Sequence, residues 1–184
     1  MNGSSTRNSR VQKRTWPKLT DIHVDADACP VREEIYRVAA CLHVSVFVVS
    51  NGSRPIRSPR MTNVSMLLVG DGADAADDWI AEHIGTTDVC VTSDIPLASR
   101  CLKRGARVVS PIGKQWTEVN IGNALTGRDI ARHLRELGEK TRGSAPLTKQ
   151  DRSRFLSVLD TALRAALREA SQNSGSPSAR PDKL

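Results

Sequence analysis

The sequence predicts an α/β fold: one domain with a parallel sheet of about five strands, flanked by helices and followed by C-terminal helices. Short β-branched runs alternate with segments of helical periodicity between residues 21 and 110. A chain of 184 residues is also long enough to bury one substantial core. Because neighbouring parallel strands need a crossover connection, usually a helix, the alternation favours a parallel sheet with helices on both faces.

The expected strands are short apolar runs bounded by turn-forming residues. The run from His43 to Ser50 is rich in β-branched side chains, as is typical of a strand covered on both faces. A loop with two prolines, NGSRPIRSP, follows it. The predicted strands span residues 21–27, 43–50, 63–70, 88–93 and 106–110.

Helices are expected in the connections between these strands. The first has Pro30 at its first position and Glu33 and Glu34 in its opening turn, where acidic residues favour the helix dipole. The segment DGADAADDWIAEHI predicts a second helix with an acidic N-terminus. A third helix is expected from Pro96 to Lys103.

The pattern becomes helical after the fifth strand. Residues 121–137 predict one helix or two, interrupted near Gly127. Thr148 and Asp151 then stand at capping-box spacing ahead of a further helix with a regular apolar stripe. We expect this last helix to pack on the domain or on a second subunit, as in a homodimer.

The chain divides into four parts. Residues 1–18 predict a disordered basic arm, and residues 19–138 form the α/β domain. Residues 139–170 hold a linker and the C-terminal helix, and residues 171–184 predict a disordered tail. The longest apolar run, Val44 to Val49, is far shorter than a membrane span, so no membrane association is expected.

The net charge of +7 is unevenly distributed. Residues 19–99 hold 5 basic and 12 acidic side chains, whereas residues 100–170 hold 15 basic and 7 acidic ones. An acidic pocket beside a basic surface suits a metal-dependent enzyme acting on a polyanion. The alternative is that exposed helices have simply collected charge.

Cysteine usage indicates a reducing compartment. The four cysteines show no CxxC pairing, and no signal peptide precedes them, which predicts a cytoplasmic protein without a zinc site. They are expected to be small buried hydrophobic residues. These cysteines are Cys29, Cys41, Cys90 and Cys101.

Carboxylates follow three of the predicted strands. Asp25 and Asp27 end the first, Asp71 and Asp74 follow the third, and Asp94 follows the fourth. Because ligands of an open parallel sheet bind outside the carboxyl ends of its strands, these side chains should converge. Such a cluster suits one or two Mg²⁺ or Mn²⁺ ions, although turns and helix caps account for one or two of the residues.

Several ordered motifs resemble one bacterial protein family. The segments DADACPVREEI, GADAADDWI and VTSDIPLASRCLKRGARVVSPIG, then NI before a helix and a DR-x-x-F helix, closely resemble the YaiI/YqxD family over residues 20–170. That family is similar to PIN-like domains, in which a parallel α/β sheet carries acidic residues that bind Mg²⁺ or Mn²⁺ for RNA cleavage. The resemblance implies an acidic site with Thr92 nearby, made of Asp25, Asp27, Asp74, Asp77 and Asp94.

These observations together predict a metal-dependent phosphodiesterase, most readily a ribonuclease. The predicted metal ligands are Asp25, Asp74, Asp77 and Asp94, with Asp27 and Asp77 completing the shell or taking a proton from the attacking water. Basic side chains of residues 100–132 are candidates for binding the RNA backbone. The candidate substrate-binding residues are Thr92, Asn51, Arg100, Arg104 and Arg128.

Two other functions fit parts of the same pattern. The DxD at residues 25–27 and the later GDGAD resemble haloacid-dehalogenase phosphatases, but Cys29 and Pro30 follow the first motif directly and the spacing is short. A protein that binds RNA or a nucleotide without catalysis is the other alternative. The chain has only six aromatic residues, so a stacking platform for single strands is poorly provided.

Overall fold

The computed structural model describes residues 20–26, 29–52, 56–57, 59–70, 72, 74–136 and 146–174. Of residues 129, 131–136 and 174 it describes the backbone alone. The predicted basic arm, most of the predicted linker and residues 175–184 of the predicted tail lie outside these ranges, as do Asp27 and Asp71.

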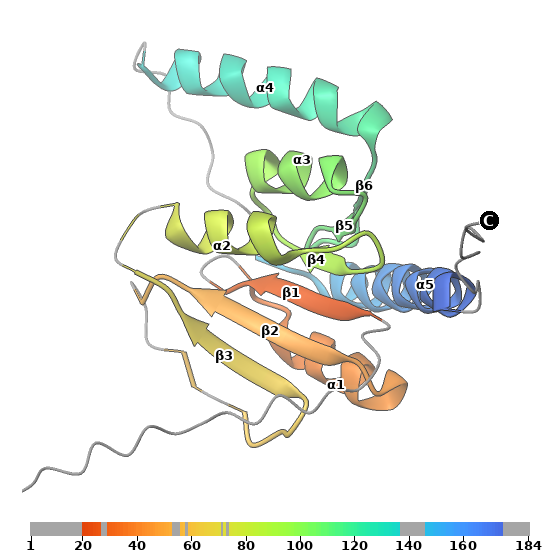
Figure 1. The fold of residues 1–184 in the computed structure, drawn as a ribbon. Coiled ribbons are helices and arrows are strands. Elements are labelled where there is room, and N and C mark those ends of the chain that lie inside the picture. The colour runs from red at the N-terminus through yellow and green to blue at the C-terminus, as the bar shows by residue number, and fades with distance from the viewer. Residues whose placement is uncertain are drawn as a thin grey trace, which may run out of the picture.

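A mostly parallel sheet forms the centre of the domain, as the sequence predicts (Figure 1). Its spatial order is β3-β2-β1-β4-β5-β6. The first five strands in the sequence pair in parallel, and β6 is antiparallel to β5. The strands are β1 (Asp21–Asp25), β2 (Ser45–Ser50), β3 (Val64–Leu68), β4 (Val89–Val91), β5 (Arg107–Val109) and β6 (Gln115–Trp116).

The sixth strand was not predicted. It turns back from β5 at Gly113, whose φ of +76° lies in the left-handed region that favours glycine. Gln115 and Trp116 are too few residues to show the alternation by which longer strands are recognised. The predicted sheet of about five strands therefore becomes a sheet with one added antiparallel edge strand.

Five helices are described: α1 (Arg32–Leu42), α2 (Ala75–His83), α3 (Ile95–Lys103), α4 (Glu118–Glu136) and α5 (Lys149–Ser174). Pro30 was expected at the first position of α1, but it lies in the turn before the helix, and Val31 is the N-cap. The break expected near Gly127 is absent, since α4 continues through that residue. One glycine costs a helix about 1 kcal/mol, which the rest of a 19-residue helix can offset.

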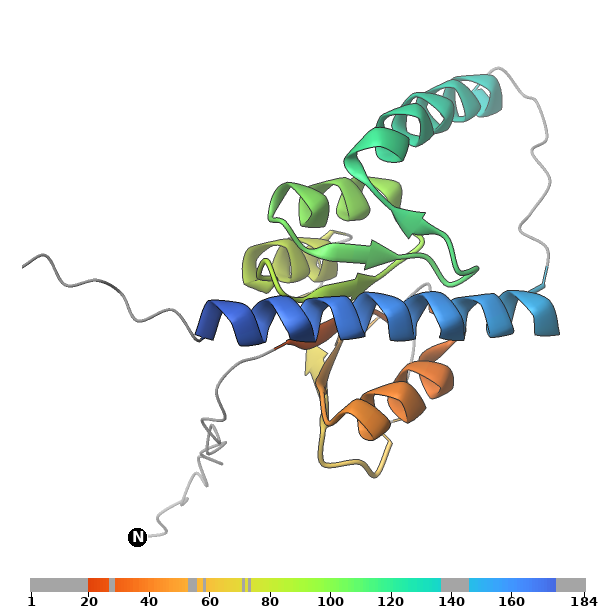
Figure 2. The same cartoon turned by 90° about the vertical axis from the view of Figure 1, so that its right-hand side faces the viewer.

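The helices cover both faces of the sheet (Figures 1 and 2). Helices α1 and α5 pack on one face, α2 and α3 pack on the other, and α4 packs on α3. Along β1, Ile22 and Val24 face α1 and α5, so His23 and Asp25 point to the face covered by α2. Alternation in this one strand thus places a carboxylate on the α2 side of the sheet.

Helix α5 packs on the domain, as expected, while contact with a second subunit stays a prediction. Its apolar stripe includes Phe155, Leu159 and Leu163, which are fully buried against the strands and α1. The predicted capping box is confirmed: Thr148 N donates to Asp151 Oδ2 over 3.0 Å, and Asp151 N donates to Thr148 Oγ1 over 3.1 Å. None of the described helices combines the length and the apolar character that crossing a membrane requires.

Candidate functional site

The direction of the strand order reverses between β1 and β4. These strands are neighbours, but the chain continues from β1 toward β2 on one side and from β4 toward β5 on the other. At such a reversal the loops after the two strands diverge and leave room for a ligand at their carboxyl ends. Asp25 is the last residue of β1, and Thr92 and Asp94 follow β4, so these three predicted site residues lie at the reversal.

A buried hydrogen-bond chain joins the ends of these two strands. Thr92 Oγ1 donates to Asp25 Oδ2 over 3.0 Å, and Asp94 N donates to Thr92 Oγ1 over 2.9 Å. Asp25 is 6% exposed and Thr92 is 1% exposed, so water does not compete strongly for these bonds. The hydroxyl of Thr92 therefore orients the carboxylate of Asp25.

Asp94 has partners on both carboxylate oxygens. Oδ1 accepts a 2.9 Å hydrogen bond from Leu97 N and caps α3, so the structural role that Asp residues often have at helix starts is present here. Oδ2 accepts a 3.0 Å hydrogen bond from Nη1 of Arg128, which lies on α4. Capping and a site role are compatible, because they use different oxygens.

Asp77 carries the strongest sign that carboxylates gather here. Burial, followed by the charges of Asp25, Asp94 and Asp74, raises the pKa of Asp77 to about 7, while Arg100 opposes the rise. Asp74 is the N-cap of α2 but makes no side-chain capping bond, so capping does not engage its carboxylate. We refer to Asp25, Asp74, Asp77 and Asp94 as the aspartate cluster.

The side chains of the aspartate cluster are of the type that binds divalent cations, but they are not arranged around one ion. Carboxylate oxygens are the donors that Mg²⁺ and Mn²⁺ prefer, and mutual repulsion among carboxylates falls when a cation binds. Among the described residues, however, no three acidic, histidine or cysteine side chains surround a common point where an ion would fit. One oxygen of Asp94 is engaged by a guanidinium instead.

The arginines predicted to bind substrate differ in position. Arg100 pairs with Asp78 at 2.8 Å, and Arg104 donates a 2.8 Å bond from Nη2 to the carbonyl oxygen of Glu82. Both contacts join α3 to α2. Arg128 pairs with Asp94 of the aspartate cluster, and the charge of Arg100 acts on Asp77.

Asn51 lies immediately beyond the carboxyl end of β2, the strand next to β1. It therefore shares an edge of the sheet with Asp25, as a substrate-binding role requires. Its substrate-binding role stays a prediction.

Two serines at the same edge were not singled out from the sequence. Ser50 and Ser110 follow the apolar runs of β2 and β5, and both are nearly buried. Ser50 Oγ accepts from Gly52 N over 3.1 Å, and Ser110 Oγ accepts from Lys114 N over 3.0 Å. Their hydroxyls stabilise the turns that follow β2 and β5. The signal in the sequence is a serine at the end of each of these two apolar runs.

Comparison with known proteins identifies relatives across most of the chain. Residues 23–165 match the family model described as "Uncharacterized BCR, YaiI/YqxD family". The UPF0178 protein RC1_2062 of Rhodospirillum centenum is 52% identical over 154 residues, covering 82% of this chain and 99% of the relative. A UPF0178 protein of Nitrobacter winogradskyi is 50% identical over 154 residues, covering 84% of this chain and 97% of the relative.

These names state no activity, substrate or partner for the relatives. No solved structure matches the chain significantly. The matched range contains the end of β1 with Asp25, the first turns of α2 and α3 with the other three aspartates, and α4 with Arg128. The chain therefore belongs to the uncharacterized YaiI/YqxD family.

Proposed function

We propose that this chain is a metal-dependent phosphodiesterase that cleaves RNA at the edge of the sheet between β1 and β4. The observation that supports it best is the raised pKa of Asp77, which follows first from burial and then from the charges of the other three members of the aspartate cluster. Like charges that close together are costly, and a bound cation relieves the cost. Carboxylates gathered at the reversal of a parallel sheet are suited to bind such an ion and its substrate.

Mg²⁺ or Mn²⁺ is the proposed cofactor, with Asp25, Asp74, Asp77 and Asp94 as its ligands. When bound, such an ion lowers the pKa of a coordinated water and neutralises charge on the leaving oxygen. Asp27, which lies outside the described residues, keeps its predicted role of completing the shell. The preference of these ions for carboxylate oxygens supports this proposal. The side chains of the aspartate cluster would have to move to surround an ion.

The chain's own residues divide the remaining work. Thr92 holds Asp25 in one orientation through its 3.0 Å hydrogen bond. Asp77 would either complete the metal shell or take a proton from the attacking water. Its pKa of about 7 belongs to the protein without a cation, whose charge would lower it.

RNA is the proposed substrate because of where charge lies in the chain. The half after residue 100 is strongly basic, and Arg128 reaches the aspartate cluster from that half. With three Trp, one Tyr and two Phe residues in the whole chain, recognition would depend on phosphate contacts rather than on stacking. Arg100, Arg104 and Asn51 are proposed to extend this contact along the backbone.

The test is cleavage of an end-labelled single-stranded RNA by the purified full chain. Mn²⁺ and Mg²⁺ are supplied in separate reactions, with EDTA as the metal-free control and a DNA of the same sequence in parallel. Asp25→Asn is the site variant, and Asp160→Asn is its matched control, because Asp160 is an exposed carboxylate on α5 outside the cluster. We expect metal-dependent cleavage that Asp25→Asn abolishes and Asp160→Asn retains.

Other outcomes reject the proposal or change its scope. Cleavage that survives Asp25→Asn would show that the activity arises elsewhere. RNA binding without cleavage in either metal would favour the alternative, a binding protein without catalysis. Equal cleavage of DNA would leave a phosphodiesterase but remove the preference for RNA.

A further inference from the structure

Strand β3 is one edge of the sheet (Figure 1). It pairs with β2 on its inward side, and no other described strand pairs with its outward side. The main sheet contacts of α1 and α2 are with β1 and β2, so these helices leave the edge of the sheet accessible. An accessible edge of this kind offers backbone hydrogen-bonding groups to a further strand.

The backbone hydrogen bonds to β2 show which groups of β3 face outward. Asn63 O accepts a 2.8 Å bond from β2, and Val69 N donates a 3.0 Å bond to it. Because bonding alternates along a parallel strand, the N–H and C=O groups of Val64, Met66 and Leu68 point away from β2. Val64 N donates a 3.4 Å bond to the turn before the strand. A further strand can therefore bond to Val64 O and to both backbone groups of Met66 and Leu68.

The segment around β3 lacks the features that usually prevent edge pairing. Residues 61–70 contain no charged side chain and no proline, and Leu68 is 77% exposed. Natural edge strands are commonly protected by lysine, by proline or by being very short. The opposite edge has such protection, since β6 has two residues and Lys114 stands directly before it. The β3 edge is therefore the one suited to pairing.

Charge on either side of this neutral segment matches a second copy of the chain. Exposed Arg57 and Arg60 precede the segment, and exposed Asp74 follows it. In an antiparallel pair around a two-fold axis, the start of each strand lies beside the end of the other. Opposite charges would then meet at both ends, whereas parallel pairing would place like charges together. The edge is thus complementary in charge to itself.

We propose that β3 pairs with β3 of a second copy of this chain, antiparallel and around a two-fold axis at Met66. Met66 then bonds to its equivalent, and Leu68 N bonds to Val64 O of the second copy, which gives about four hydrogen bonds. The same register places the exposed side chain of Leu68 opposite Val64, and apolar cross-strand pairs of this kind stabilise a sheet. This interface requires neither metal nor RNA, so it does not depend on the proposed function.

Sedimentation velocity of the purified full chain over a range of concentrations measures the association. A five-residue edge buries little surface, so the dimer should dissociate on dilution. Leu68→Lys adds a charge to the edge at an exposed position, and Val119→Lys is the matched control, at an 88% exposed apolar residue on α4. We expect Leu68→Lys to raise the dissociation constant about ten-fold or more and Val119→Lys to change it less than about two-fold.

A charge reversal tests the orientation of the two strands. Arg60→Glu would place an acidic side chain near Asp74 of the second copy, so it should weaken the dimer about two- to five-fold at low salt. Arg37→Glu, at an exposed position on α1, is the control and should associate as wild type does. If Arg60→Glu also associates as wild type does, the antiparallel register is wrong.

Hydrogen exchange measured by NMR tests the backbone pairing itself. The amides of Met66 and Leu68 should exchange slowly at high protein concentration and faster on dilution, because the second copy protects them. The amides of Ser65 and Leu67 face β2 and should be protected at both concentrations. In Leu68→Lys, the amide of Met66 should exchange fast at both concentrations.

Three results would each reject the pairing. A wild type that sediments as a monomer at every concentration shows no second copy on this edge. A dimer that Leu68→Lys leaves intact, with fast exchange at Met66, uses another surface. Protection of Met66 and Leu68 that does not change on dilution shows that a segment of the same chain, such as residues 1–18, covers the edge. None of these results changes the test of RNA cleavage.

Discussion

Thr92 Oγ1 donates a hydrogen bond of 3.0 Å to Asp25 Oδ2 across the ends of β4 and β1. The same oxygen accepts a 2.9 Å bond from Asp94 N, so one hydroxyl serves two of the aspartates proposed as metal ligands. Thr92 and Asp25 are 67 residues apart in the sequence. Parallel pairing of the two strands is what brings them into contact.

Replacing this hydroxyl should destabilise the protein. Thr92→Val keeps the size of the side chain but leaves a buried carboxylate oxygen and a buried backbone amide without this partner, so we expect a loss of about 1–3 kcal/mol. Urea unfolding followed by circular dichroism measures the change. Thr161→Val removes an exposed hydroxyl bonded to Ser157 O and should cost under about 0.5 kcal/mol. Equal stability of Thr92→Val and wild type would contradict the importance of the bond.

The raised pKa of Asp77 predicts a stability change with pH. The folded protein holds the proton of Asp77 up to about pH 7, whereas the unfolded chain loses it near the usual value of about 4. The stabilising effect of this proton on the free energy of unfolding is therefore fully present below about pH 4, and it is lost as the pH rises to about 7. Asp77→Asn, which cannot ionise, should be more stable than wild type at pH 8 by about 1–2 kcal/mol, allowing for solvent screening of a half-buried group.

Urea unfolding at pH 5 and pH 8 measures this difference, which should be smaller at pH 5. Asp160→Asn is the control and should show no stabilisation that grows with pH. Mg²⁺ at pH 8 should stabilise wild type more than Asp77→Asn if the cation binds the aspartate cluster. A constant difference between Asp77→Asn and wild type at both pH values would refute the raised pKa.

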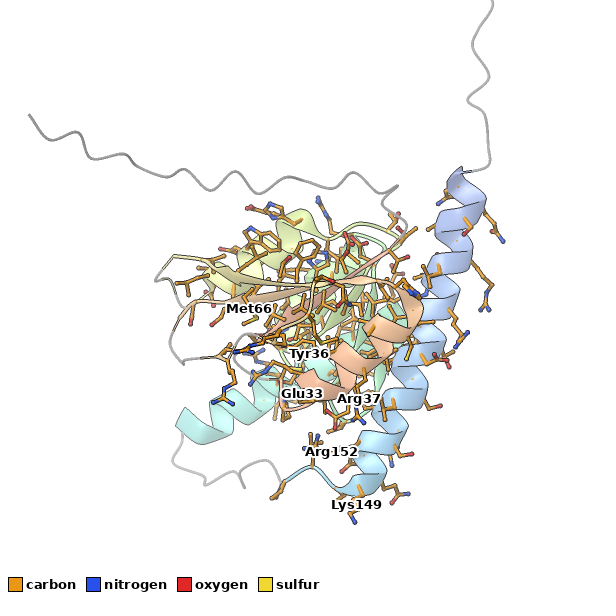
Figure 3. All side chains as sticks on the ribbon, turned by 90° about the horizontal axis from the view of Figure 1, so that it is seen from below. Glu33, Tyr36, Arg37, Met66, Lys149 and Arg152 are labelled. Atoms are coloured by element: carbon orange, nitrogen blue, oxygen red, sulfur yellow. The ribbon has the colours of Figure 1, made fainter. Side chains whose placement is uncertain are left out.

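Arg152 links α5 to α1 through Glu34. Its Nη1 lies 2.5 Å from Glu34 Oε1, and the Glu34 side chain is 8% exposed. Within the described part of the chain, Oε2 of Glu34 has no hydrogen-bond partner. Figure 3 shows Arg152 on the part of α5 that runs beside α1, near Glu33 and Arg37. Arg152→Leu should therefore cost about 1–3 kcal/mol in unfolding free energy, because it leaves a nearly buried carboxylate unpaired.

The double variant Arg152→Leu with Glu34→Leu distinguishes that explanation from lost packing. Since it removes the stranded charge, it should recover part of the stability lost in the single variant. Arg154→Leu, at a 52% exposed side chain on the same helix, is the control and should have little effect. If the double variant is no more stable than Arg152→Leu, the unpaired charge is not the cause.

Two glycines should respond oppositely to alanine. Gly113 has a φ of +76°, and a Cβ there would lie 2.7 Å from Phe155 N in the backbone of α5. Gly113→Ala should cost about 2 kcal/mol or more, because strain at a positive φ adds to a clash with backbone. Gly127→Ala, in an open position within α4, should instead stabilise the protein by about 0.5–1 kcal/mol. Thermal unfolding of both variants checks the contrast, and a shift in the same direction for both would contradict it.

The fold was largely predictable because its signals are local. Five of the six strands correspond to apolar runs, and the cap of α5 follows from the spacing of Thr148 and Asp151. The exceptions are local as well. Strand β6 has two residues, which are too few to show a strand pattern. Helix α1 begins two residues after Pro30, with Val31 as its N-cap.

The positions of Asp25, Asp74 and Asp94 at or after the ends of parallel strands predict that they lie at one edge of the sheet. The side chains that contact them depend on how the helices pack. Arg128 pairs with Asp94, 34 residues earlier in the sequence, while Arg100 and Arg104 pair with Asp78 and the carbonyl oxygen of Glu82 on α2. The pKa of Asp77 was likewise decided by burial and by three neighbouring charges. The strands can be predicted from patterns of neighbouring residues. These contacts depend on how α2, α3 and α4 pack against one another, and residue spacing does not reveal that packing.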